Sequence, residues 1–109
     1  MASVFKNATQ AVGTSYATAY TCPALTTAIV IFAQVANVTG TTSTDLSLQW
    51  LDSSQSNLAT ELAHTISIPA NASLGTLDGK LVLEAGDALQ AKASANTSLV
   101  LSLSVLEMS

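Results

Sequence analysis

Two segments of this chain place apolar residues at alternate positions. Segment 98–108 places an apolar residue at every second position, at Leu99, Leu101, Leu103 and Val105. Segment 43–52 does the same with Leu46, Leu48 and Trp50. A period of two is typical of a β-strand with one buried and one solvent-facing side. Both segments are therefore predicted to be strands, with core residues Leu48, Trp50, Leu101 and Leu103.

Six further segments carry strand patterns, namely 3–9, 14–21, 26–38, 57–68, 79–85 and 87–95. Segment 26–38 is apolar on both sides at its start, so we predict a central strand covered on both faces. Segment 57–68 could open a short helix with Leu58 and Leu62 on one face. A strand is favoured because alternate positions form one face and Pro69 ends it; these positions are Thr60, Leu62, His64, Ile66 and Ile68.

Turn-forming residues separate these segments at 38–43, 52–57, 69–79 and 94–98. About eight short strands at such spacing predict an all-β fold, a two-sheet β-sandwich of the jelly-roll type. The 109 residues are expected to form a single domain, 1–109, because no linker, charge block or repeat divides them. Residues 1–12, which end before Gly13, could be an N-terminal arm or the first strand.

Charged residues are scarce in this chain, and their number and sign argue against several classes of partner. Three Lys, no Arg and seven acidic residues give a net charge of −4. Nucleic-acid binding is not expected, because phosphate contacts need clustered basic residues. The longest apolar run, 28–33, is far shorter than the ~20 residues that a membrane-spanning helix requires. The N-terminal residues do not resemble a secretory signal.

One acidic pair is close enough in sequence to suggest a site. Glu84 and Asp87 flank Gly86 in the sequence LVLEAGDALQAKAS. A calcium ion takes six to eight oxygen ligands, and Asp78 is the only other acid nearby in sequence. A structural corner is the favoured interpretation, in which Gly86 adopts a positive φ and Asp87 accepts a backbone hydrogen bond. No metal and no cofactor are expected here.

Catalytic residues are not apparent, so we expect no enzyme. His64 is the only imidazole, and no nucleophile–base–orienter set can be recognised around it. Cys22 has no second cysteine to pair with and is expected to be a small buried residue. Trp50 could stack on a sugar, but its alternation with two leucines favours the core. A polar sugar site stays open.

Four stretches of the sequence resemble a known group of proteins. They are Tyr-Thr-x-Pro-Ala at 20–24, Ile-Pro-Ala at 68–70, LVLEAGD at 81–87 and the terminal VLE at 105–107. Together they resemble small virion proteins of tailed bacteriophages, especially cyanophages, over about Tyr20–Glu107. The resemblance implies a β-sandwich virion module.

Among such modules, the resemblance points first to a capsid cement or decoration protein. Such a protein is made in the host cytoplasm, forms a homotrimer on the capsid surface and bridges copies of the major capsid protein. The alternative is a receptor- or glycan-binding module of a tail fibre or spike. If residues 1–12 form an arm, Val4 and Phe5 are the expected capsid contacts, because exposed apolar side chains there need a partner.

Overall fold

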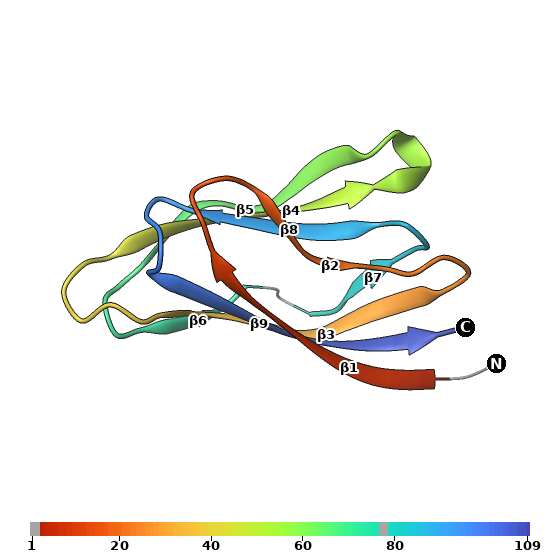
Figure 1. Ribbon diagram of the computed structural model, residues 1–109, viewed down its shortest axis with the longest axis horizontal. Helices are drawn as coiled ribbons and strands as arrows, with labels where there is room; N and C mark the ends of the chain where they lie inside the picture. The colour runs from red at the N-terminus through yellow and green to blue at the C-terminus, as the bar shows by residue number, and fades with distance from the viewer. Residues whose placement is uncertain (1–2, 77–78) are drawn as a thin grey trace.

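The computed structural model describes residues 3–76 and 79–109, and over these residues the chain forms nine strands in two packed antiparallel sheets (Figure 1). Sheet A contains β1 (Ser3–Val12), β9 (Leu99–Met108), β3 (Thr27–Asn37), β6 (Ser73–Gly75) and β7 (Leu81–Leu83). Sheet B contains β2 (Ala17–Thr21), β8 (Ala88–Ala93), β4 (Thr44–Asp52) and β5 (Leu58–Ile68). A short 3₁₀ helix, η1 (Ser53–Gln55), lies between β4 and β5. The predicted β-sandwich is confirmed.

The strand order is that of a jelly roll. Sheet A runs β1-β9-β3-β6, with β7 also paired to β3, and sheet B runs β2-β8-β4-β5. The first strand therefore pairs with the last, and the chain crosses between the sheets at most of its turns. Two short strands, β6 and β7, both pair with β3 along the same edge of sheet A. The described residues therefore contain nine strands, whereas about eight were predicted. No helix in the described part of the chain could span a membrane.

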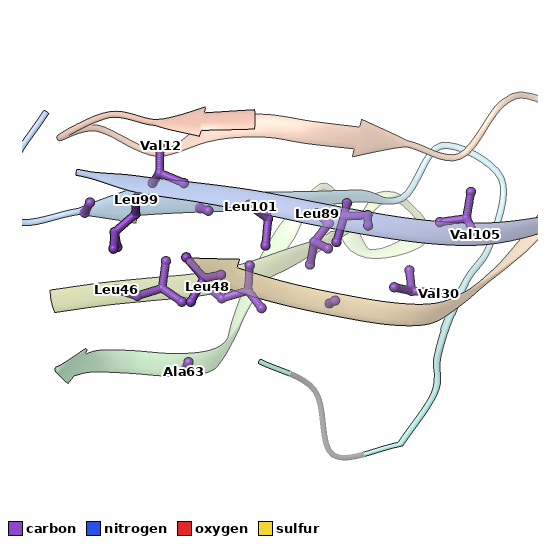
Figure 2. Close-up of a cluster of buried hydrophobic side chains, with 14 of the residues drawn as sticks. Val12, Val30, Leu46, Leu48, Ala63, Leu89, Leu99, Leu101 and Val105 are labelled. Atoms are coloured by element: carbon purple, nitrogen blue, oxygen red, sulfur yellow. The ribbon is translucent and has the colours of Figure 1, made fainter. Parts of the chain in front are cut away.

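The core lies between the sheets and consists of the alternate residues of the long strands (Figure 2). Leu48, Leu101 and Leu103 are buried as predicted. Trp50 is the exception, because it is only partly buried and packs against the margin of the core. It lies two residues before β4 ends at Asp52.

Strand β3 is covered on one face only, so the prediction that both faces would be covered is wrong. Ala28, Val30 and Val35 point into the core. The register shifts between Val30 and Phe32, and the bulge leaves Ile31 and Phe32 exposed. None of the described elements packs over this side of sheet A, so the apolar start of β3 faces outward.

Strand β5 is a strand and not a helix, but it does not keep the predicted single face. Its pairing with β4 is irregular between Leu46 and Gln49, and Thr65 has a φ of +47°. These irregularities turn Ala63 and Ile68 inward, while His64 and Ile66 are exposed. The two-residue period of apolar positions in the sequence does not show where a bulge interrupts the strand.

Element boundaries differ from the predictions at three places. Segment 14–21 is strand only from Ala17, segment 79–85 only over Leu81–Leu83, and the predicted turn 69–79 contains β6. Within the described part of 1–12, all ten residues of β1 pair with β9. This stretch is therefore the first strand of the sandwich and not a separate arm.

Replacing Leu101 by alanine should lower the free energy of unfolding by about 2–5 kcal/mol, because Leu101 is fully buried and its loss leaves a cavity. Chemical denaturation of both proteins measures the difference. The matched control is Ser102→Ala on the outward face of the same strand, which should change stability by no more than about 0.5 kcal/mol. Equal effects of the two substitutions would contradict the inward assignment of Leu101.

Candidate functional site

The turn between β7 and β8 contains the acidic pair that the sequence singled out. The amide of Asp87 donates to the carbonyl of Glu84 at 2.9 Å, which closes the turn. Gly86 has a φ of +88°, and a Cβ there would lie 2.9 Å from the Ser53 hydroxyl oxygen. Both the backbone conformation and the space therefore require glycine.

Three carboxylates meet at this turn, because Asp52 at the end of β4 lies beside Glu84 and Asp87. One oxygen from each falls within 4.8 Å of the others. Asp87 is only 1% exposed, and its carboxylate accepts from the Ser53 amide and hydroxyl and from the Glu84 amide at 2.9–3.0 Å. With its oxygens engaged by the protein, the Asp87 carboxylate serves to join the two turns.

Asp52 was not among the residues that the sequence suggested. It accepts from Ser54 and Gln55, and the Ser54 hydroxyl holds the pKa of Asp52 below its ordinary value. An Asp that precedes Ser-Ser-Gln is a recognisable capping signal. Its approach to Asp87, 35 positions later, depends on the packing of two turns. Asp78, the other acid considered for a metal site, lies outside the described residues.

The acidic turn also holds the loop between β2 and β3. Cys22 donates its amide to the Asp87 carbonyl at 2.8 Å and accepts from the Gly86 amide at 2.9 Å. Cys22 is buried, as expected, and its Sγ donates to the Thr26 carbonyl at 3.3 Å; burial raises the pKa of its thiol. The loop anchored in this way presents Leu25, which is 93% exposed and has a φ of +60°. Such a bulky residue in the left-handed region is uncommon.

A polar contact joins the two sheets at the same end of the sandwich. Glu107 points inward from β9 and accepts from the hydroxyl of Tyr20 on β2, at 2.5 Å. Its other oxygen lies 3.0 Å from the ammonium of Lys6 on β1. The Tyr20 hydroxyl and the Lys6 ammonium hold the pKa of Glu107 below its ordinary value. Desolvation, followed by the bond to Glu107, raises the pKa of Tyr20.

An apolar row crosses the outer face of sheet A near this end. Cross-strand pairing places Phe5 of β1 beside Leu106 of β9, Leu106 beside Ile29 of β3, and Ile29 beside Val82 of β7. Phe5 is 73% exposed and Val82 is 54% exposed. Phe32 is exposed one pair further along the sheet, opposite Ser104. We call this set the apolar row; it is defined by Phe5, Ile29, Phe32, Val82 and Leu106.

No charged residue lies on the outer face of sheet A within its strands. The outward residues of β1 are Ser3, Phe5, Asn7, Thr9 and Ala11, and their partners on β9 are the even-numbered residues from Val100 to Met108. Lys6 and Glu107, the charged residues of these two strands, are on the inner face. Val4 pairs with Glu107 and shares that inner face, so of the two proposed contact residues only Phe5 belongs to the outer face.

The outer face of sheet B has the opposite character. Gln49 donates to Gln90 at 2.8 Å, and Gln90 donates to Thr18 at 3.2 Å, so a row of hydrogen-bonded side chains crosses three strands. Glu61, on the fourth strand, lies opposite Gln49 and 2.7 Å from the ring of His64. His64 is exposed and pairs with this carboxylate. Cys22 instead contacts Thr26 in its own loop and the Gly86–Asp87 turn, so the structure does not bring the two residues together.

Comparisons with known proteins identify the fold but no family. No protein-family model matches the chain, and no curated protein matches it in sequence. A solved capsid of Helicobacter pylori bacteriophage KHP30 contains a chain with a TM-score of 0.59 and 13% identity, over 98% of this chain and 87% of that one. The disulfide-linked pili of Bacillus endospore appendages contain one with a TM-score of 0.58 and 11% identity, over 99% and 87%.

The T13 particle of the infectious bursal disease virus IBDV also contains a similar chain. The TM-score is 0.58 and the identity 10%, over 96% of this chain but only 30% of that one. Identities this low establish a shared sandwich fold and nothing more. Chains with this fold therefore occur in solved viral particles and pili.

Replacing Gly86 by alanine should destabilise the fold by about 1–3 kcal/mol, because the new Cβ would meet Ser53 while the backbone keeps a positive φ. The matched control is Gly75→Ala in β6, where an added Cβ has no neighbour within 4 Å. Thermal and denaturant unfolding of both variants measure the difference. A Gly86→Ala protein as stable as the Gly75→Ala protein would contradict the proposed corner.

Stability should fall with acid in part through Glu107. A carboxyl whose pKa is lowered by folding stabilises the fold above its unfolded pKa of about 4.3, and this stabilisation is lost as the pH falls through the lower folded value. The stability difference between the wild type and Glu107→Gln should therefore narrow from pH 6 to pH 3. Tyr20→Phe removes the largest cause of the lowered Glu107 pKa. When both proteins carry Tyr20→Phe, the stability difference made by Glu107→Gln should therefore narrow less over the same pH range. Parallel stability curves for the wild type and Glu107→Gln would contradict this role.

Proposed function

We propose that this protein is a structural component of a phage virion, a cement or decoration protein that binds the outer surface of the assembled capsid. The observation that carries the proposal is the uncharged outer face of sheet A with its apolar row. The use of the same fold in the bacteriophage KHP30 capsid and the IBDV particle supports it. So does the sequence resemblance to small virion proteins of tailed phages.

The outer face of sheet A is large enough to support such an attachment. Strand spacing and rise give it an area of about 600 Å². A standard stable interface buries about 800 Å² on each partner, so this face together with its margin approaches that size. Leu25 projects from the adjacent β2–β3 loop and extends the apolar surface beyond the sheet. Burying one exposed phenylalanine contributes about 1.5–3 kcal/mol, so a few such side chains dominate the attachment.

The expected partner is the major capsid protein, in its assembled form. A small protein that touches two or more subunits at once gains avidity only where the lattice holds those subunits together. Its binding free energy then adds to the stability of the lattice, because it does not bind the separated subunits. The protein is proposed to act as a homotrimer, with the sheet edges and segments 38–43 and 69–79 as its contact surfaces, and to be made in the host cytoplasm.

A second candidate function is a receptor- or glycan-binding module of a tail fibre or spike. The observation that favours it is the polar outer face of sheet B, where hydrogen-bonded amides and hydroxyls lie beside charged groups. Polar faces of this kind suit hydroxylated ligands. The two functions predict different locations in the virion, which electron microscopy of intact particles distinguishes.

Capsid binding should depend on the apolar row. Phe5→Ser and Val82→Ser should each weaken binding to expanded empty capsids of the parent phage at least about tenfold, which corresponds to 1.4 kcal/mol of lost apolar burial. Co-sedimentation of purified protein with capsids measures the affinity. The matched control is Leu58→Ser, which removes an apolar side chain 53% exposed on β5 of the other sheet and should leave binding unchanged.

The same binding should depend little on salt. Because the face of sheet A carries no charge, raising sodium chloride from 0.05 to 0.5 M should change the affinity less than about threefold. Equal losses from Phe5→Ser and Leu58→Ser, or no capsid binding by the wild type, would contradict the proposal. Sedimentation of the free protein tests the trimer separately.

A further inference from the structure

A hollow on the outer face of sheet B lies apart from the acidic corner and the apolar row. It has a volume of about 290 Å³ and opens between β4, β5 and β8. Its polar lining consists of Thr14, Asp45, Ser47, Thr65, Lys92 and Ser94, and Ala93 completes it. This volume is at the lower end of the range for small-molecule sites, so the hollow fits a small ligand.

Two hydroxyls of the hollow are fixed by the backbone. The Ser47 hydroxyl oxygen accepts from the Thr65 amide at 3.0 Å, and the Ser94 hydroxyl oxygen accepts from the Asp45 amide at 2.9 Å. Each bond uses an oxygen lone pair and leaves the hydroxyl hydrogen as a donor. The hollow therefore holds two hydroxyl groups whose oxygens are held in place by the backbone before any ligand arrives.

The charges of the hollow balance each other. Asp45 supplies a carboxylate, an acceptor of two or more hydrogen bonds, and Lys92 supplies an ammonium with three donors. The Lys92 ammonium lies 4.9 Å from the centre of the Tyr16 ring, and this cation–π contact restrains it. The lining itself carries one negative and one positive group and presents several hydroxyls beside them, so it matches a neutral ligand with several hydroxyl groups.

The backbone beside the hollow is strained. Thr65 has a φ of +47°, which is rare for a β-branched residue and costs stability. The strain results from the bulge in β5, which brings Thr65 to the hollow and aims its amide at Ser47. Bulges and strained residues of this kind are concentrated at ligand sites.

We propose that this hollow is a binding site for one neutral sugar residue, whose hydroxyl groups donate to Asp45 and accept from Lys92, Ser47 and Ser94. The site is on the sheet opposite the one that carries the apolar row, so both surfaces can be occupied at once. A protein attached through sheet A would display this site on its outer side. The sugar site does not require capsid attachment, and each can fail without the other.

Titration of the isotopically labelled full-length protein with methyl glycosides of glucose, galactose, mannose and N-acetylglucosamine tests the site, followed by the amide resonances of the protein. At least one glycoside should shift the amides of Thr65, Lys92 and Ser94 saturably, with a dissociation constant of the order of 1–10 mM, as expected for so small a ligand. Asp45→Asn and Lys92→Met should each weaken that binding at least about fivefold, since each removes direct contacts.

Matched controls separate the site from general effects. Glu84→Gln removes an exposed carboxylate at the acidic corner and should leave the sugar affinity unchanged. Amide spectra of Asp45→Asn and Lys92→Met without sugar should retain the dispersion of the folded wild type, since neither side chain is part of the core. Absence of saturable shifts with all four glycosides would overturn the proposal. So would shifts with inorganic phosphate or sulfate alone, or sugar binding that survives both substitutions.

Discussion

Strand β9 is the element on which the rest of the structure depends. It pairs along its whole length with β1 on one side and with β3 on the other. Its inward residues from Leu99 to Val105 are buried, and Glu107 continues the same face to the end of the sheet. A slip of one residue would expose that entire apolar set, so its register is strongly determined. The pairing with β9 then sets the position and register of β1 and β3 in the sheet.

The two outer faces of the sandwich differ because their cross-strand rows differ. On sheet A, pairing brings together Phe5, Leu106, Ile29 and Val82, which come from four strands and form one apolar row. On sheet B, pairing brings together glutamines and threonine that bond to one another. Because the chain has so few charged side chains, few of them are available to interrupt an exposed apolar surface. The asymmetry gives the protein one face suited to attachment and another suited to water and polar ligands.

The end of the sandwich near Leu25 is held by hydrogen bonds between turns. The Asp87 carboxylate joins its own turn to η1, and its backbone joins the β2–β3 loop. Tyr20 and Glu107 join the sheets. Three of the segments through which the sequence resembles phage virion proteins, 20–24, 81–87 and 105–107, therefore meet at one end, although they are far apart along the chain. Their shared role is structural, since they fix the loops beside the apolar row.

By itself, the sequence determined the β-sandwich, most of the strands and the core positions Leu48, Leu101 and Leu103, because alternation is local and the hydrophobic effect decides which side is buried. It also indicated the glycine of the corner, since a positive φ is a local requirement. Only the tertiary structure decided the rest. Cross-strand register formed the apolar row, turn packing brought Asp52 to Asp87, and bulges in β3 and β5 exposed Phe32 and His64. These features depend on contacts between residues distant in sequence, which a local pattern cannot encode.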